Sequence, residues 1–287
     1  MKRGLLTRLV LLICIALPAG AGPARAQGEI WRELPSPLPM PPPTSGGYAW
    51  INGIQLYYAT YGTGAPLLLL HGALGNSDYW GNQVPAFARK YRVIIVDSRG
   101  HGRSTRDNRL YSYNLLARDI LALLDLLKID KVSVVGWSDG ANLGLHLAIH
   151  HPERLNKLVV FEANYRPSGI RGDIDSNDTF LRYVELANHD YERLSATPHD
   201  YPLFLRIVSI FWGSEPDFTA AELGRITVPT MIAAGEHDEA IKRDHTLQLA
   251  KLVSGARLEI LPNASFFAMW QQPKAFNRMV LQFLENK

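Results

Sequence analysis

Short apolar runs alternate with amphipathic stretches along most of the chain. A continuous apolar run of four to seven residues is typical of a strand that is buried on both faces of a sheet. Between these runs, leucine and isoleucine recur at helical spacing. The predicted strands lie at 67–70, 93–96, 132–135, 158–161, 228–234 and 257–261, and the predicted helices at 79–91, 113–127, 241–253 and 273–284. Strands and helices that alternate in this way predict an α/β fold with a mostly parallel central sheet flanked by helices.

Two segments depart from this alternation. Residues 48–51 and 54–61 flank Asn52-Gly53, a strong two-residue turn signal, and predict an antiparallel hairpin at the edge of the sheet. Between residues 163 and 225 the alternation lapses, and helical pieces rich in aromatic residues replace it. An insertion that lies over the carboxyl ends of the strands would be a helical lid. The alternative is that its aromatic side chains form only the core of the lid itself.

The first 26 residues have the pattern of a secretory signal peptide. A basic start (Lys2, Arg3 and Arg8) precedes an apolar run at 9–17, and Ala24-Arg25-Ala26 has the small-x-small pattern of a cleavage site. The apolar run is too short for a lasting membrane-spanning helix. We therefore expect export to the periplasm or the medium. The intact mass of exported protein should correspond to a chain that begins at Gln27, and a mature protein that retained residues 1–26 would contradict this.

Removal of this segment would change the charge and the cysteine count. The segment holds four basic residues and no acidic one, so the formal net charge would fall from +3 to −1. No basic face then suggests nucleic acid as a partner. Cys14 is the only cysteine, so the remaining chain needs a core rather than disulfides for stability. Residues 27–46 are rich in proline and predict an extended leader, and residues 47–287 suffice for one large domain.

One motif carries specific chemistry. Residues 136–140 read Gly-Trp-Ser-Asp-Gly, directly after a predicted buried strand and directly before a predicted helix. In this context Gly-x-Ser-x-Gly is a nucleophile elbow, a tight strand-to-helix turn that exposes the serine hydroxyl. The flanking glycines avoid side chains that would collide with the neighbouring strand and helix. Ser138 is therefore the candidate nucleophile.

The chain resembles the α/β-hydrolase fold family, and specifically its lid-bearing serine esterase branch. The motifs that carry the resemblance occur in the family's order: His71-Gly72-Ala73, Asp97-x-Arg99-Gly100-x-Gly102-x-Ser104, Gly136-x-Ser138-x-Gly140 and Gly235-Glu236-His237-Asp238. The resemblance covers nearly all of residues 47–287. It implies acyl transfer through Ser138, without a cofactor, on a small-molecule ester or a related acyl substrate.

The resemblance also implies roles for other residues. The backbone N–H groups of Ala73 and Asp139 would form the oxyanion hole, and Asp238 would be the acid that orients the base. Glu236 and Glu239 are competitors for the role of the acid, and the alternative role for Asp238 is that of a helix N-cap. His71 is expected to brace a turn rather than to catalyse.

The expected base is missing from this pattern. The family places a histidine in the loop after the last strand, and the sequence there is Ala264-Ser265-Phe266-Phe267, with Phe266 in the histidine's position. Phenylalanine cannot accept a proton, so Ser138 would lack its general base. Three explanations compete: an inactivated variant of an active esterase, a natural pseudo-hydrolase that binds ligand without turnover, and an enzyme whose base lies elsewhere. The candidates for a relocated base are His237, His245, His189 and His199, and His245 is expected to face solvent.

A metal site is not expected. His237, Asp238 and His245 lack a recognisable spacing of zinc ligands. The alternative from a different functional class is a binding protein that uses the pocket under the lid. The aromatic residues of the lid favour an apolar acyl or aryl group in either case.

Overall fold

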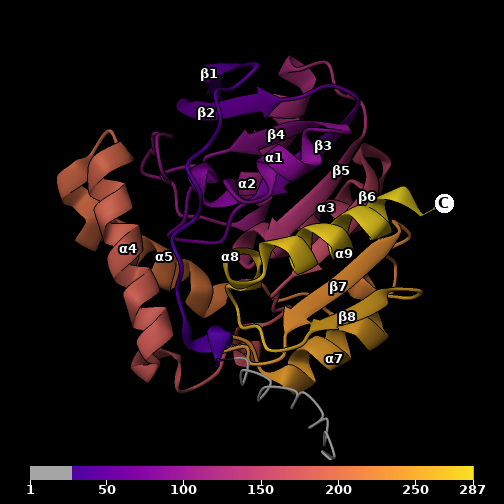
Figure 1. Cartoon of the computed structure of the whole chain (residues 1–287). Helices are drawn as coiled ribbons and strands as arrows, with labels where there is room; N and C mark the ends of the chain where they lie inside the picture. The colour runs from indigo at the N-terminus through magenta and orange to yellow at the C-terminus, as the bar shows by residue number, and fades with distance from the viewer. Residues whose placement is uncertain (1–27, 287) are drawn as a thin grey trace, which may run out of the picture.

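An eight-stranded sheet runs through the molecule in the order β1-β2-β4-β3-β5-β6-β7-β8 (Figure 1). The structure is a computed structural model that describes residues 28–286, so the predicted signal peptide lies outside the described residues. The strands are β1 (Ser45–Ile51), β2 (Ile54–Tyr61), β3 (Ala65–Leu70), β4 (Tyr91–Val96), β5 (Val132–Trp137), β6 (Leu155–Phe161), β7 (Thr230–Gly235) and β8 (Arg257–Leu261). The β1–β2 and β2–β4 pairs are antiparallel, and the remaining pairs are parallel. The α/β fold with an edge hairpin is confirmed.

Helices cover both faces of this sheet. They are α1 (Val84–Phe87), α2 (Tyr113–Leu126), α3 (Asp139–His150), α4 (Asp178–Leu194), α5 (Tyr201–Ser214), α6 (Ala220–Leu223), α7 (Arg243–Leu252), α8 (Ala268–Gln271) and α9 (Pro273–Glu285). The central strands β3, β5 and β6 are almost wholly buried between them. Among the described residues, none of the helices is long and apolar enough to cross a membrane.

One predicted helix is wrong. Residues 79–91 form no continuous helix but a short 3₁₀ turn, η2 (Ser77–Trp80), followed by the single-turn helix α1. Pro85 lies in the first turn of α1. Because proline has no N–H to donate and its ring clashes with the preceding turn, a helix can start at Pro85 but cannot run through it.

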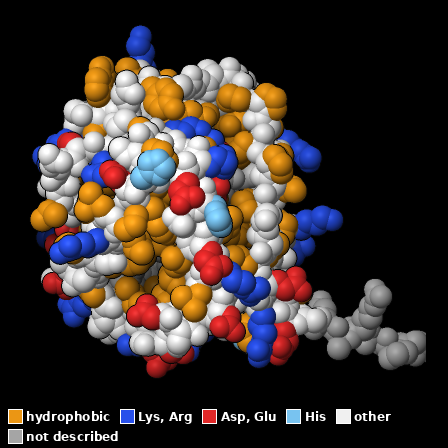
Figure 2. All heavy atoms as spheres, turned by 90° about the vertical axis from the view of Figure 1, so that its left-hand side faces the viewer, with side chains coloured by type: hydrophobic (Ala, Val, Ile, Leu, Met, Phe, Trp, Pro, Cys, Tyr) orange, Lys and Arg blue, Asp and Glu red, His pale blue; other side chains and the backbone are white. Residues whose placement is uncertain are grey.

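Residues 163–225, which we call the inserted segment, lie between β6 and β7 and hold α4, α5 and α6. Helices α4 and α5 pack against each other through aromatic rings, with the centroids of Tyr191 and Phe204 4.8 Å apart. The Tyr201 hydroxyl donates to the Val184 carbonyl at 3.1 Å and joins the two helices. These helices stand at the left of Figure 1, and Figure 2 shows that face, where hydrophobic side chains gather between charged ones.

The proline-rich leader is docked on the body of the protein. The Gln271 amide, on α8, donates to the carbonyls of Trp31 at 3.1 Å and Glu33 at 2.8 Å. From α4, the Arg182 guanidinium donates to the Arg32 carbonyl at 2.7 Å. Further along, the leader runs up the body in an extended conformation and enters β1 at Ser45, two residues before the predicted start of the domain (Figure 1). The leader therefore bridges α8 and the inserted segment.

Candidate active site

The turn between β5 and α3 holds Ser138 in a strained backbone conformation. Its φ is 55° and its ψ is −120°, a combination that non-glycine residues rarely adopt. A side chain at Gly136 would bring its Cβ within 2.3 Å of the Gly140 carbonyl oxygen, and one at Gly140 within 2.1 Å of the Leu70 carbonyl oxygen. Only glycine fits at either position. The predicted elbow geometry is therefore present.

Ser138 lines a cavity of about 220 Å³. This volume is below the 300–1,000 Å³ that is usual for sites of drug-sized ligands. Its other lining residues are mainly apolar and come from the start of α3, the turn after β7, the 264–267 loop and the inserted segment: Asp139, Asn164, Ile170, Ile174, Asp175, Phe180, Trp212, Ala240, Ile241 and Phe266. The cavity therefore suits a small apolar group next to the Ser138 hydroxyl.

The loop after β3 brings Ala73 next to this serine. A Cβ on Gly72 would lie only 3.1 Å from the Ser138 Cβ, so the absence of a side chain permits the close approach. His71 Nε2 accepts from the Ser98 N–H at 3.0 Å, so Nδ1 carries the proton and donates to the Gly72 carbonyl at 2.7 Å. Burial lowers the pKa of His71 to about 4, which keeps the ring neutral. His71 is a brace of this loop, as the sequence predicts.

Asp139 follows the nucleophile, and its side chain is fully engaged. The Tyr113 hydroxyl and the Trp212 indole N–H both donate to its carboxylate, the latter at 2.8 Å. Burial raises the pKa of Asp139, and hydrogen bonds from Tyr113, Trp212 and the Ala73 N–H oppose that rise. Both predicted oxyanion residues thus lie beside Ser138, with the Asp139 carboxylate close to the Ala73 N–H.

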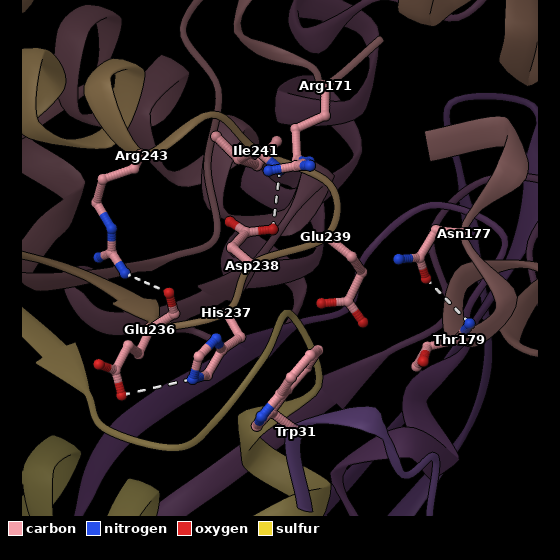
Figure 3. Close-up of a pocket in the computed structure, with 10 residues that line it drawn as sticks. All are labelled: Trp31, Arg171, Asn177, Thr179, Glu236, His237, Asp238, Glu239, Ile241 and Arg243. Carbon is pink, nitrogen blue, oxygen red and sulfur yellow. Dashed lines mark hydrogen bonds and ion pairs between the residues drawn. The ribbon is translucent and has the colours of Figure 1, made fainter. Parts of the chain in front are cut away.

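Asp238 lies in the turn after β7 (Figure 3). Its Oδ1 accepts from the backbone N–H groups of Ala240 at 2.7 Å and Ile241 at 2.8 Å. Helix α7 begins only at Arg243, so Asp238 does not cap it. Asp238 Oδ2 is buried and has no hydrogen-bond partner among the described residues. A carboxylate oxygen has two lone pairs, so Oδ2 can accept a further donor even beside the neighbouring Glu162 carboxyl.

Glu162, directly after β6, is a buried carboxyl next to Asp238. Its Oε1 accepts from the Gly235 N–H at 2.6 Å, which ties it to the end of β7. Burial, together with the neighbouring Asp238 carboxyl, raises the pKa of Glu162 well above its ordinary value. Burial raises the pKa of Asp238 as well, but hydrogen bonds from the Glu162 carboxyl and from the Ile241 and Ala240 N–H groups oppose that rise, so the pair favours the proton on Glu162.

Phe266 lies between Ser138 and the turn at residues 236–241, which holds Asp238 and which we call the acid turn. Its ring lines the cavity of Ser138 and lies 5.3 Å from the Trp137 ring. Its backbone N–H donates to the Glu239 carboxylate at 3.0 Å, directly beside Asp238 in sequence. Its carbonyl accepts from the Trp137 indole at 3.1 Å. The structure therefore brings Phe266 together with Ser138 and the acid turn.

No histidine of the described residues lines the cavity of Ser138. His237 is exposed and stacks on Trp31 of the leader, with ring centroids 4.4 Å apart (Figure 3). His189 and His199 are exposed in the inserted segment. His245, which we expected to face solvent, is buried, because its ring stacks on Tyr165 and its Nε2 accepts from the Tyr165 N–H at 3.0 Å. That expectation was wrong, and His245 serves packing.

Glu239 should give the protein a measurable pH dependence of stability. Burial raises its pKa to about 7, above the ordinary value of 4.5. The native protein therefore binds a proton there that the unfolded chain has released, so the free energy of unfolding falls as the pH rises from 4.5 to 7. The contribution lost is about 3 kcal/mol. Urea unfolding across this range should show a weaker pH dependence for Glu239→Gln, whereas parallel curves would contradict the assignment.

Sequence reasoning missed Glu162, Tyr113 and Trp212. A signal for Glu162 was available, because it directly follows β6 as Asp238 follows β7. The carboxyl ends of adjacent parallel strands meet at one edge of a sheet. Trp212 lies in the inserted segment, where no motif indicates which aromatic side chain turns toward Asp139. Glu239 was weighed only as a substitute for Asp238, and the structure instead places it against the backbone of Phe266.

Comparison with known proteins agrees with this geometry. The model of the alpha/beta hydrolase fold matches residues 65–198. The human serine hydrolase BPHL is 30% identical, over 82% of this chain and 84% of the relative. The 3-oxoadipate enol-lactonase 2 of Acinetobacter baylyi is 31% identical, over 79% and 92%. Among solved structures, the enol-lactonase from Burkholderia xenovorans LB400 has a TM-score of 0.67 and 25% identity, covering 84% of this chain and all of that one. The strand order, the nucleophile elbow and these relatives together show that the chain belongs to the α/β-hydrolase fold family and is a hydrolase by descent.

Proposed function

We propose that the protein is a serine hydrolase of small apolar carboxylic esters that acts through an acyl-enzyme. Its rate is low because Phe266 stands in the position of the general base. The observation that supports this most is Ser138, held at a strained turn and facing an apolar cavity. The relatives named above include an enol-lactonase, and a lactone is an internal ester. In this reading the inserted segment is a lid, since Phe180 and Trp212 line the cavity from it.

The reaction would begin when Ser138 Oγ attacks the ester carbonyl carbon. The new C–O bond turns the carbonyl oxygen into an oxyanion, for which the N–H groups of Ala73 and Asp139 are the proposed donors. The alkoxide would leave with a proton, and water would then hydrolyse the acyl-serine. Each step needs a group that takes up and returns a proton, and Phe266 supplies none.

A non-catalytic binding protein is the second candidate. The observation that favours it is the absence of a histidine among the residues that line the cavity of Ser138. Such a protein would bind the apolar part of an ester reversibly, and its affinity would not depend on the Ser138 hydroxyl.

Labelling with a fluorophosphonate separates the two functions. The serine oxygen attacks phosphorus, fluoride leaves, and the hydroxyl proton passes to a base. We expect the Phe266→His variant to be labelled at Ser138 at least about 100-fold faster than the parent chain. Ser138→Ala is the matched control and should remain unlabelled. If Phe266→His gains no labelling and ligand affinity is the same with and without the Ser138 hydroxyl, the binding protein is the correct function.

We also propose that the hydrolase acts outside the cytoplasm, on the strength of the predicted signal peptide.

A further inference from the structure

The inserted segment hydrogen bonds to both residues of the proposed oxyanion hole. From α4, the Tyr183 hydroxyl donates to the Ala73 carbonyl at 2.7 Å. From α5, the Trp212 indole N–H donates to the Asp139 carboxylate at 2.8 Å. We infer that Tyr183 and Trp212 are positioning residues that couple the seating of the inserted segment to the geometry of the oxyanion hole. This inference rests on the proposed function.

Tyr183 completes the orientation of the Ala73 N–H. The peptide that contains this N–H is planar, so its direction is opposite to that of the Gly72 carbonyl. His71 Nδ1 and the Gly75 N–H, at 3.1 Å, hold the Gly72 carbonyl from within the body. The next peptide contains the Ala73 carbonyl. Among the described side chains, only that of Tyr183 donates a hydrogen bond to this carbonyl. With both flanking peptides fixed, the Ala73 N–H has one direction.

The Tyr183 ring is well suited to this task because it cannot move freely. It is 2% exposed and packs on the rings of Trp137, at 5.6 Å, and Phe267, at 5.2 Å. Trp137 precedes the nucleophile, and Phe267 follows Phe266. The hydroxyl is therefore fixed by the same aromatic cluster that surrounds the elbow.

Trp212 acts on Asp139, the second residue of the proposed oxyanion hole. The Ala73 N–H favours the ionised form of the Asp139 carboxyl, so this carboxylate would compete with a substrate oxyanion for that N–H. Tyr113 and Trp212 supply this carboxylate with other donors. Because the Trp212 ring also lines the cavity, an occupied cavity would hold the indole in the position that keeps the Asp139 carboxylate satisfied.

The test compares a ligand that carries a tetrahedral anion with one that does not. Phenylboronic acid accepts an electron pair from Ser138 Oγ, the hydroxyl proton passes to solvent, and an anionic boronate forms beside the oxyanion donors. Phenol fills the same cavity without an anion. Calorimetric titrations should show that Tyr183→Phe and Trp212→Phe each weaken boronate binding by about tenfold, a fraction of the loss on removing a donor outright. Phenol binding should change by less than about twofold in Tyr183→Phe, and in Trp212→Phe, whose ring lines the cavity, it should weaken less than boronate binding does.

Tyr201→Phe is the matched control, because its hydroxyl bonds only to a carbonyl within the inserted segment. Equal effects of Tyr183→Phe and Tyr201→Phe on boronate binding would overturn the inference. If Ser138→Ala binds boronate as the parent does, the proposed function fails instead. Amide hydrogen exchange then tests the positioning separately: residues 71–75 should exchange faster in Tyr183→Phe than in Tyr201→Phe, and equal rates would overturn the inference whatever the chemistry at Ser138.

Discussion

Replacing Phe266 with histidine should raise the hydrolysis of a p-nitrophenyl ester by about three orders of magnitude or more. The side chain at this position lines the cavity of Ser138, while its backbone N–H is anchored beside Asp238 through Glu239. Apart from the neighbouring Glu162 carboxyl, the buried Asp238 Oδ2 has no donor among the described residues, so it can accept the N–H of an imidazole. A positioned general base is commonly worth 10²–10⁴ in rate, and initial rates at neutral pH measure it directly.

Two further substitutions control this prediction. Adding Ser138→Ala to Phe266→His should erase the gain, because the base acts only through the serine hydroxyl. Adding Asp238→Asn should erase most of it, since an amide would leave the imidazole in the wrong orientation or tautomer. A parent chain that is already fast, and that Phe266→His leaves unchanged, would show that another group is the base.

The second large effect should be on stability, from Gly140→Ala. The added Cβ would lie 2.1 Å from the Leu70 carbonyl oxygen and 2.5 Å from the Leu70 carbonyl carbon, which are backbone atoms at the end of β3. Helix α3 would have to move away from the sheet, so we expect a loss of about 3 kcal/mol or more in the free energy of unfolding. Urea unfolding measures this loss, and fluorophosphonate labelling of Ser138 in the Phe266→His background should fall with it.

Gly213→Ala is the matched control for this substitution. Gly213 is also helical, in α5, but an added Cβ there would have no atom within 4 Å. Alanine in a helix is favoured over glycine, so this variant should be unchanged or gain up to about 1 kcal/mol. Equal effects of the two substitutions would mean that the contact between Gly140 and β3 does not limit the packing of α3.

The central sheet could be predicted from the sequence because its buried strands contain continuous apolar runs, and a short apolar run fits few structures other than a buried strand. The runs at 67–70 in β3 and 158–161 in β6 are examples. The elbow was predictable for a different reason. A side chain at residue 136 or 140 would clash with backbone atoms, so glycine is required at both positions and the Gly-x-Ser-x-Gly motif results. The helix predicted at 79–91 failed because its apolar residues have helical spacing although Pro85 prevents a continuous backbone.

The rest of the site depends on contacts between residues far apart in the chain. The burial of His245 follows from Tyr165, 80 residues away, and the pairing of Glu162 with Asp238 follows from the neighbouring positions of β6 and β7. Neither contact leaves a periodic pattern. The roles of Ser138 and Asp238 follow from local motifs, whereas the orientation of Trp212 requires the three-dimensional packing of α5.

The docked leader has a practical consequence for anyone who produces this protein. Trp31 stacks on His237, one residue from Asp238, so a purification tag joined just before Gly28 would be fused beside the acid turn. The carboxyl end of α9, beside the mark C, lies well away from the start of the leader in Figure 1. A tag at the carboxyl end is therefore the safer design for kinetic work. Expression vectors that begin at residue 47, the predicted domain boundary, would remove the bridge between α8 and α4 and should yield a preparation whose active-site loops are less ordered.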